Sequence, residues 1–339
     1  REKRREEKRP RVTHTHTHTR SIRTRLQNAR MDPQLQALAN CFKATVSPNS
    51  ATRKQAEAQL KTQSTQRGFA IALLKLVKHF SSVANDPHAS TVCLSASIYF
   101  KRNIEQCWND HESDEAGGGG GNKENKINAQ DRSVIKEHLV DFMCAVPQKI
   151  QMQFSAAIGV ISKRDFPDQW KTLLPKLVGR LDPKNLTTTV AVLKTAHAIF
   201  KRFRNVAKTD ANLYPLKIAL EQFQEPMLKI FQVLCQLLQK HGKDRQQRGN
   251  LEKLFVALTL IAKMMFSLCW LDLPEFFEDH MKDYFEPFHF FLNYSNPVVE
   301  ADADEYQPSL GDKLKKSIVK VLNLYAGKYE EEFMPFFPI

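Results

Sequence analysis

Hydrophobic residues recur at spacings of three and four along most of this chain. Phe69, Leu73, Leu76 and Phe80 illustrate the pattern, which places them on one face of a helix and leaves polar residues on the other. No segment shows the strict alternation of apolar and polar residues that is typical of a half-buried strand. The pattern therefore predicts an all-α protein.

The predicted helices form consecutive pairs that repeat about every 40 residues, a period typical of helical solenoids. Turns rich in Pro, Asn and Asp separate the helices. We predict an α-α superhelix of six helix pairs and the start of a seventh. The predicted pairs are 34–46 with 50–63, 69–80 with 87–108, 131–145 with 148–163, a helix capped by Asp165 with 186–204, 213–241 with 249–270, and 274–292 with 310–333, and the seventh begins at Met334.

Three segments interrupt this succession. Segment 109–128 contains five consecutive glycines and segment 294–309 is acidic, so both are predicted as flexible loops. Residues 1–30 include a Thr-His repeat typical of a translated dinucleotide repeat, and we interpret them as a disordered, non-native leader. Met31 is then the expected start, with Asp32 capping the first helix. A metal-binding His tract or a nuclear localisation signal are the alternative readings of the leader.

The net charge, the cysteines and the longest apolar run indicate which classes of protein the sequence does not fit. Residues 1–30 hold eleven basic and three acidic residues, and so contribute most of the net charge of +13. The rest of the chain is too weakly basic to predict nucleic-acid binding. Six scattered cysteines without a CxxC pair predict reduced, mostly buried thiols. The most apolar run, 255–270, is too short to span a bilayer, which predicts no membrane insertion.

Sequence motifs for catalysis are missing. The chain has no phosphate-binding loop, no HExxH, no GxSxG and no zinc-type Cys and His spacing. We therefore expect no enzyme activity, no catalytic residue, no bound metal and no cofactor. Acidic residues 275, 278, 279 and 283 are predicted to form a solvated helix face.

Two surface patterns instead suggest protein binding. Basic residues gather at the ends of second helices, where they complement the helix dipole or form an edge that faces an acidic partner. The candidates for a partner-facing basic edge are Lys201, Arg202 and Arg204. On the helix 87–108 a stripe of Leu94, Ile98, Lys101 and Glu105 mixes apolar and charged groups, as an interface does, although packing against a neighbouring repeat explains its apolar members equally well.

Three segments carry a resemblance to a known family: Ser-Lys-Arg-Asp-Phe-Pro-Asp-Gln-Trp at 162–170, Leu-Lys-Thr-Ala-His-Ala-Ile-Phe-Lys-Arg-Phe-Arg at 193–204, and Asp-Leu-Pro-Glu-Phe-Phe-Glu-Asp at 272–279. They resemble the N-terminal arch of importin-beta (karyopherin-beta) transport receptors, and within that family the CAS-type exportins. The resemblance runs from about residue 31 to the end. It implies that 31–339 is an N-terminal HEAT-repeat arch of the importin N-terminal domain type.

The resemblance also implies partners: Ran in its GTP form, importin-alpha as cargo, and nuclear pore proteins. In such receptors the second helices of the first repeats contact Ran. The candidate Ran contacts are Arg53, Glu57, Leu94, Ile98, Lys101, Arg102, Glu105, Gln151, Lys163 and Arg164. The family's Phe-Lys-Asn element matches Phe100 and Lys101, but Arg102 replaces the asparagine, and Glu105 and Gln106 replace basic residues.

These features predict a nuclear export receptor that shuttles between nucleus and cytoplasm and binds Ran-GTP and importin-alpha cooperatively. Two alternatives remain at this stage. In an importin-type receptor Ran-GTP would expel the cargo instead of recruiting it. A HEAT-repeat scaffold for a signalling complex would bind its subunits without regard to nucleotide.

Overall fold

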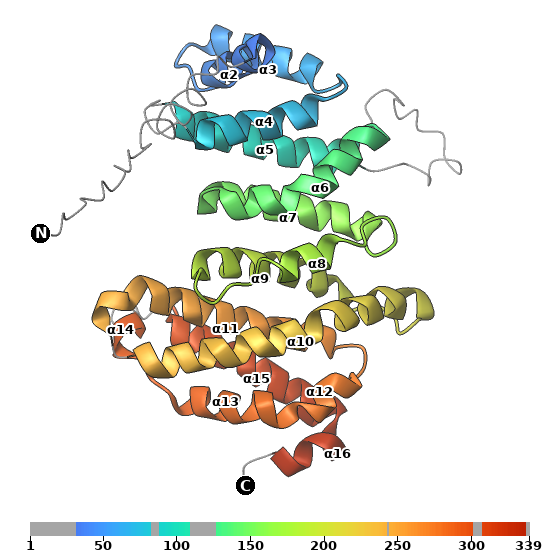
Figure 1. Ribbon diagram of the computed structural model, residues 1–339, viewed down its shortest axis with the longest axis vertical. Helices are drawn as coiled ribbons and strands as arrows, with labels where there is room; N and C mark the ends of the chain where they lie inside the picture. Colours follow the sequence, from blue (N-terminus) through green and yellow to red (C-terminus); the bar gives the residue numbers. More distant parts are fainter. Residues whose placement is uncertain (1–31, 83–87, 109–126, 243, 301–306, 337–339) are drawn as a thin grey trace, which may run out of the picture.

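The computed structural model describes residues 32–82, 88–108, 127–242, 244–300 and 307–336. Every regular element of these residues is a helix, and the helices stack in the order of the sequence into one elongated array (Figure 1). The predicted all-α solenoid is confirmed. The predicted leader 1–30 and nearly all of the predicted loop 109–128 lie outside the described residues.

The helices form two layers. The first helices of the pairs are α2 (Pro33–Thr45), α4 (Phe69–Ser81), α6 (Ala129–Ala145), α8 (Leu173–Val178), α10 (Asp210–His241) and α13 (Met281–Asn293). The second helices are α3 (Ser50–Gln63), α5 (Ala89–Cys107), α7 (Gln148–Asp165), α9 (Leu186–Phe200), α11 (Arg248–Leu268) and α15 (Leu310–Lys328). Short helices join or follow them: η3 (Lys201–Phe203), η4 (Arg245–Gln247), α12 (Glu275–Asp279), α14 (Pro297–Glu300), α16 (Glu330–Phe333) and η5 (Met334–Phe336).

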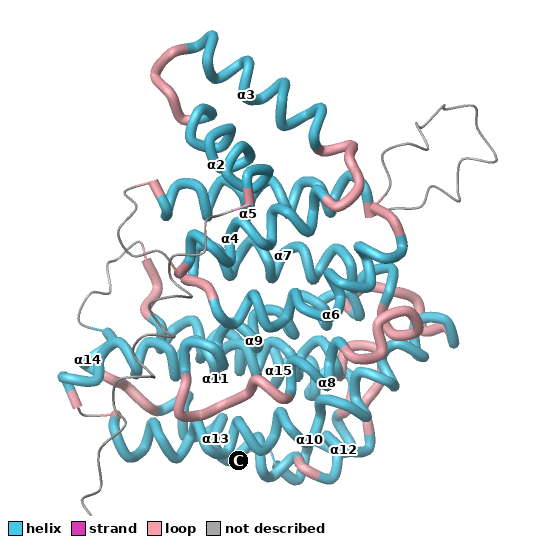
Figure 2. The backbone as a smooth tube through the Cα atoms, turned by 45° about the horizontal axis from the view of Figure 1, so that its top comes forward, coloured by secondary structure: helices cyan, strands magenta, loops and turns pink. Residues whose placement is uncertain are grey.

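The second helices make the continuous part of the stack. Helices α5, α7, α9, α11 and α15 each pack on the next, while the first helices pack on one another less extensively. At one end, α2 rather than α3 makes the main contacts with the second pair, so the first pair is turned relative to the others (Figure 2). From α5 onward the second helices therefore form a nearly continuous layer of parallel helices.

Sequence patterning explains where the apolar surface goes. In α11 the predicted series of Leu and other apolar residues at 251, 254, 258, 261, 265 and 268 is buried throughout. This helix is enclosed because α9, α10 and α15 all pack against it. Aromatic rings fill the seam between the last pairs: Phe231 stacks on Tyr284 with ring centroids 5.1 Å apart, and Phe285 meets Tyr325 edge-on at 5.0 Å.

Side chains next to the turns fix several helix starts. The Asp32 carboxylate accepts a hydrogen bond from the Gln34 backbone N–H, and Pro33 occupies the first turn of α2, as predicted. Asn49 and Asn128 cap α3 and α6 in the same way. Ser309 and Asp312 form a reciprocal capping box at the start of α15.

Asp165 is not the helix cap that the sequence suggested. Helix α7 continues through it, and the next helix begins only at Leu173, because a cis peptide before Pro167 and a series of turns separate the two. The Asp165 carboxylate is buried instead. It accepts hydrogen bonds from the Trp108 indole N–H at 3.1 Å and the Lys136 ammonium at 2.8 Å. One carboxylate thus joins the end of α5, the middle of α6 and the end of α7.

The predicted loop at 294–309 contains a short helix in its first part, and its residues 301–306 lie outside the described residues. Residues 297–300 form the short helix α14, whose Val298 and Val299 are buried against α11 and α15. The Asn296 side chain donates to the Gly242 carbonyl at 2.8 Å and accepts from the Val298 backbone N–H. Buried valines and the Asn296 side chain together attach residues 296–300 to the core.

Polar contacts across the seams show the repeat length directly. The Arg202 guanidinium donates to the Ser162 carbonyl, and the Thr195 hydroxyl donates to Ser155, in both cases 40 residues apart. Later in the chain the corresponding contact, from the Tyr329 hydroxyl to the Cys269 carbonyl, spans 60 residues. The predicted period of about 40 residues holds for the middle pairs and lengthens where α10 extends over 32 residues.

Two arginines after α9 hold neighbouring repeats together. Arg202 lies over the Phe166 ring at 5.2 Å and donates to the Ser162 carbonyl. Arg204 reaches α11, where it donates to the Lys263 carbonyl at 2.9 Å and lies over the Phe266 ring at 5.0 Å. Both guanidinium groups are half-buried between helices rather than directed at solvent.

His197 lies beside the second of these arginines. Its Nε2 is 3.4 Å from an Arg204 guanidinium nitrogen, a position that a neutral imidazole tolerates and an imidazolium does not. Burial, reinforced by the positive charges of Arg204, Lys263 and Lys201, lowers the pKa of His197 to about 4.

The buried carboxylate generates the first prediction. In Lys136→Met the Asp165 carboxylate loses its cation while it stays buried, so we expect a loss of about 2 to 3 kcal/mol in unfolding free energy, measured by urea denaturation. Lys208→Met is the matched control, because the side chains of Lys208 and its ion-pair partner Asp272 are both more than half exposed and their pairing should matter little. Equal shifts in the two variants would contradict a special role for Asp165.

The histidine generates the second prediction. Because the folded pKa of His197 lies below its unfolded value of about 6.5, the unfolded chain binds the extra proton between pH 6.5 and 4. The stability from this site should be complete above pH 6.5 and decline as pH falls toward 4, by about 3 kcal/mol. His197→Gln should lack that part of the pH dependence in denaturation curves. Parallel curves for both proteins would show that His197 titrates normally.

Candidate protein-binding surface

The predicted Ran contacts all lie on the second-helix layer. Two are on α3, five on α5 and three on α7, so they belong to one layer of the first three pairs. Their exposure differs, however. The exposed members are Glu57, Arg102, Glu105, Lys163 and Arg164, while Arg53, Leu94, Ile98 and Lys101 are half-buried and Gln151 is buried.

The predicted stripe on α5 is partly accessible along its length. Leu94, Ile98 and Lys101 are half-buried, and Glu105 is exposed. Lys101 remains accessible and forms an ion pair of 3.5 Å with Glu105 one turn later. Such an exposed pair contributes little stability and separates easily when a partner offers a better match.

Two of the predicted contacts serve the fold instead. The Arg53 guanidinium donates to the carbonyls of Ser47 and Pro48 at 2.7 and 2.9 Å, which closes the turn between α2 and α3. Gln151 is only 6% exposed. Sequence spacing could not reveal either outcome, because both depend on how the adjacent helix and turn pack.

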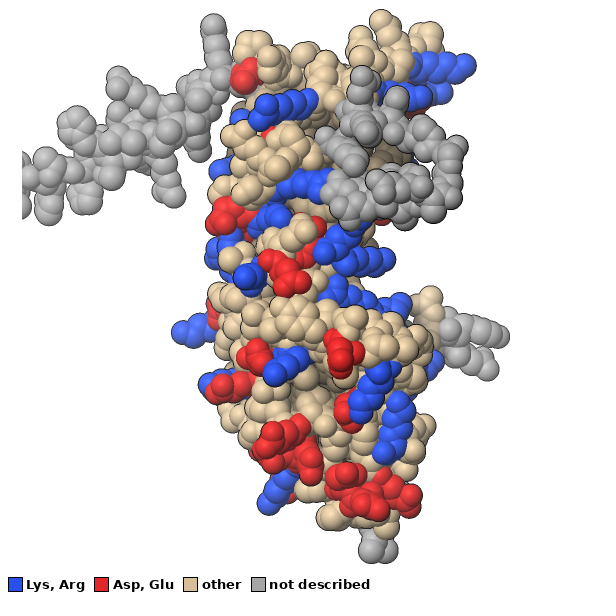
Figure 3. Space-filling model, turned by 90° about the vertical axis from the view of Figure 1, so that its right-hand side faces the viewer, with Lys and Arg blue, Asp and Glu red and all other residues tan. Residues whose placement is uncertain are grey.

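Only one of the three residues of the predicted basic edge is exposed. The ends of α5, α7 and α9 lie along one side of the stack, where Figure 3 shows Lys and Arg over the upper and middle parts and Asp and Glu gathered at the bottom. Of the three residues assigned to the edge, Lys201 is exposed. Arg202 and Arg204 are half-buried, and their guanidinium groups donate to carbonyls of neighbouring helices, so the partner-facing edge stays a prediction.

Exposed acidic residues of the last pairs lie on α12 and α16. Glu275, Glu278 and Asp279 are exposed, as predicted, and Glu330 to Glu332 are exposed as well. The fourth predicted member, Asp283, accepts from the His280 ring nitrogen at 2.7 Å. The edge is therefore basic along the early pairs and acidic at the last ones.

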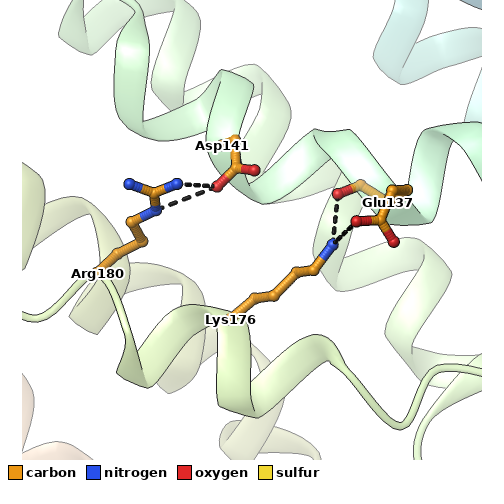
Figure 4. Close-up of polar contacts among 4 residues, drawn as sticks. All are labelled: Glu137, Asp141, Lys176 and Arg180. Carbon is orange, nitrogen blue, oxygen red and sulfur yellow. Dashed lines mark hydrogen bonds and ion pairs between the residues drawn. The ribbon is translucent and has the colours of Figure 1, made fainter.

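Two cations of the first-helix layer, on or just after α8, are paired with acidic residues of α6. The Lys176 ammonium on α8 donates to the Glu137 carboxylate on α6 at 2.7 Å, and Arg180 donates to Asp141 at 2.6 Å (Figure 4). The hydrogen bond and charge of Lys176 lower the pKa of Glu137. These two cations therefore already have acidic partners on the preceding helix of the layer.

The described residues contain no group of three His, Cys, Asp or Glu side chains that could hold a metal ion. Within the same part of the chain, no helix combines the length and apolar character needed to cross a bilayer. Burial raises the pKa of Cys144 to about 11 and of Cys235 and Cys269 to about 12, so these thiols stay protonated and unreactive at neutral pH.

One surface feature escaped the sequence reasoning. A pocket opens on the second-helix layer between α7 and α9, with α11 at its rim. Its lining consists of Gln148, Gln151, Met152, Ser155, Thr187, Val190, Ala191, Lys194 and Lys253. The sequence did contain one indication of this pocket. Met152 is a large apolar residue of α7, yet it does not belong to the buried face of that helix.

Comparison with known proteins now adds to this geometry. Residues 56–145 match the family model described as importin-beta N-terminal domain, and residues 199–338 match the model described as Cse1. Exportin-2 of Oreochromis niloticus and of Homo sapiens are each 34% identical over 307 residues, which is 91% of this chain and 30% of those proteins. The importin-alpha re-exporter of Schizosaccharomyces pombe is 36% identical over 286 residues, 84% of this chain and 28% of that protein.

The fold is similar to that of a solved relative. The structure described as the exportin Cse1 in its cargo-free, cytoplasmic state superposes with a TM-score of 0.76 and 31% sequence identity, covering 89% of this chain and 30% of that one. The present chain thus spans about 30% of the length of the relatives it matches. The matched family models and the solenoid fold both indicate the same family. The chain belongs to the importin-beta family, where it is similar to the exportin-2 and Cse1 members.

Proposed function

We propose that this protein is a nuclear export receptor that binds Ran-GTP and importin-alpha cooperatively and returns importin-alpha to the cytoplasm. The observation that carries the proposal is similarity over most of the chain to exportin-2 and to an importin-alpha re-exporter, together with a shared fold. Those relatives are transport receptors rather than enzymes. Shuttling through the nuclear pore, with contacts to pore proteins, follows from the same proposal.

The second-helix layer of the first three pairs is the proposed Ran surface. It presents exposed charges of both signs, including Arg102 on α5 and Lys163 on α7, which pack side by side, and Glu57 on α3 of the first pair. Mixed charge on this surface suits a partner whose surface is also charged, because complementary potentials speed association and fix orientation. Residues 31–339 would act together as one N-terminal arch in this receptor.

The solenoid offers a physical route to cooperative binding. Each pair contacts only its neighbours, so small rotations at successive seams add up to a change in curvature. If Ran-GTP and cargo both prefer the same curvature, the first ligand supplies the free energy of bending and the second binds more tightly. Linkage then requires each ligand to raise the affinity of the other by the same factor.

The central experiment compares nucleotide states. Immobilised full-length protein should capture Ran loaded with a non-hydrolysable GTP analogue and leave GDP-loaded Ran in solution, and importin-alpha should raise the affinity for Ran-GTP by about fivefold to a hundredfold. Equal capture of both nucleotide states would end the receptor proposal. Loss of Ran-GTP on addition of importin-alpha would indicate an importin-type receptor instead.

A charge reversal tests the proposed Ran surface. Lys101→Glu places a second negative charge beside Glu105 on the exposed side of α5, and we expect about tenfold weaker Ran-GTP binding by surface plasmon resonance, mainly through slower association. Lys217→Glu is the control, because Lys217 is exposed on α10 in the first-helix layer. An unchanged affinity in Lys101→Glu would move the Ran contact away from this part of α5.

A further inference from the structure

The pocket between α7 and α9 combines an apolar floor with a basic rim. Its volume is about 200 Å³, and its apolar lining comes from Met152, Val190 and Ala191. Met152 is 57% exposed although it is a large apolar side chain, whereas Val190 and Ala191 are almost buried at its base. A methionine can adapt its shape to an inserted group, since its side chain is unbranched and flexible.

The rim carries two lysines that nothing else in the described chain neutralises. Lys194 projects from α9 and Lys253 from α11, and among the described residues neither has a hydrogen bond or an ion pair. The nearest acidic residue in sequence, Glu252, is already paired with Arg248 at 3.0 Å. Two ammonium groups therefore stand at one apolar pocket without a counter-charge from the described residues.

Helix direction adds to this positive field. Contacts of Thr195 with Ser155, of Arg202 with Ser162 and of Arg204 with α11 show that α7, α9 and α11 run parallel. Their N-terminal ends, which carry partial positive charge, therefore lie on the same side as the pocket. None of the three has an acidic residue in its first turn.

Positive charge continues along the second-helix layer toward α15. That helix carries five lysines, and its single acidic residue, Asp312, is used in the capping box with Ser309. Lys263 on α11 and Lys320 on α15 are exposed, and partial desolvation, followed by the charge of Lys320, lowers the pKa of Lys263. The second-helix layer from α9 to α15 is thus basic over its length, unlike the paired charges of α6 and α8.

We propose that this pocket anchors an acidic segment of a protein partner, which inserts one aliphatic side chain between Met152 and Val190 and directs flanking carboxylates to Lys194 and Lys253. The inference rests on the proposed receptor function, because it names the chemistry of the segment that such a receptor would hold. A protein is favoured over nucleic acid as the occupant, because the lining holds no aromatic ring for base stacking and the floor fits an apolar side chain.

The test uses a fluorescein-labelled peptide in which one leucine is flanked by glutamates, with fluorescence anisotropy at low ionic strength. We expect the full-length protein to bind it and the double variant Lys194→Glu, Lys253→Glu to bind at least tenfold more weakly. Lys217→Glu on α10 should leave the affinity unchanged, since its lysine lies in the other layer. Circular dichroism of each variant monitors folding.

The apolar anchor is tested separately from the charges. A peptide with alanine in place of leucine should bind about tenfold more weakly, since it loses most of the buried aliphatic surface. Met152→Gln, at an exposed position, should weaken the leucine peptide and leave the alanine peptide unaffected. Equal binding of the two peptides would overturn the proposal. Competition by an RNA oligonucleotide that depends on the same lysines would also overturn it, because the site would then attract any polyanion.

The outcome is distinguishable from that of the proposed function. The peptide assay does not involve Ran. If the protein binds Ran equally in both nucleotide states but still prefers the leucine peptide, the receptor proposal fails and the pocket proposal is supported. The converse result, nucleotide-dependent capture of Ran without peptide selection, would overturn the pocket alone.

Discussion

No helix pair of this protein can bury its apolar face alone, and this constraint governs the rest of the structure. Helix α11 shows the consequence most clearly, because its apolar residues face α9, α10 and α15 together. Burial therefore comes from the neighbours, and stability is distributed over the seams between pairs. A chain built this way offers a long layer of helices as its surface, which suits the binding of other proteins better than the enclosure of a small substrate.

Polar side chains decide how each pair sits on the next. Asp165 unites Trp108 and Lys136 at a point where three helices meet, and Arg202 and Arg204 hold α9 against its neighbours. Apolar faces can slide past one another with little change in buried area, whereas hydrogen bonds to a buried carboxylate or carbonyl accept one arrangement. These groups supply the register of the array, and the hydrophobic seams supply most of its stability.

The two layers differ in what they offer to partners. On the first-helix layer, cations such as Lys176 and Arg180 meet acidic side chains of the preceding repeat. On the second-helix layer, Lys194 and Lys253 have no such partner among the described residues. Uncompensated charge on a packed, parallel layer produces a field that extends into solvent and attracts a complementary surface.

The sequence by itself determined the fold class, the pairing of helices and most of their ends, since helical periodicity and capping residues such as Asp32 act over a few neighbouring positions. It also showed the family resemblance that the comparisons confirmed. Only the tertiary structure decided which basic residues face outward. Lys201 and Arg202 are adjacent in sequence, yet one is solvated and the other lies against Phe166 of the previous repeat. Contacts between residues 40 or 60 positions apart leave no local pattern, because they depend on how whole helices dock.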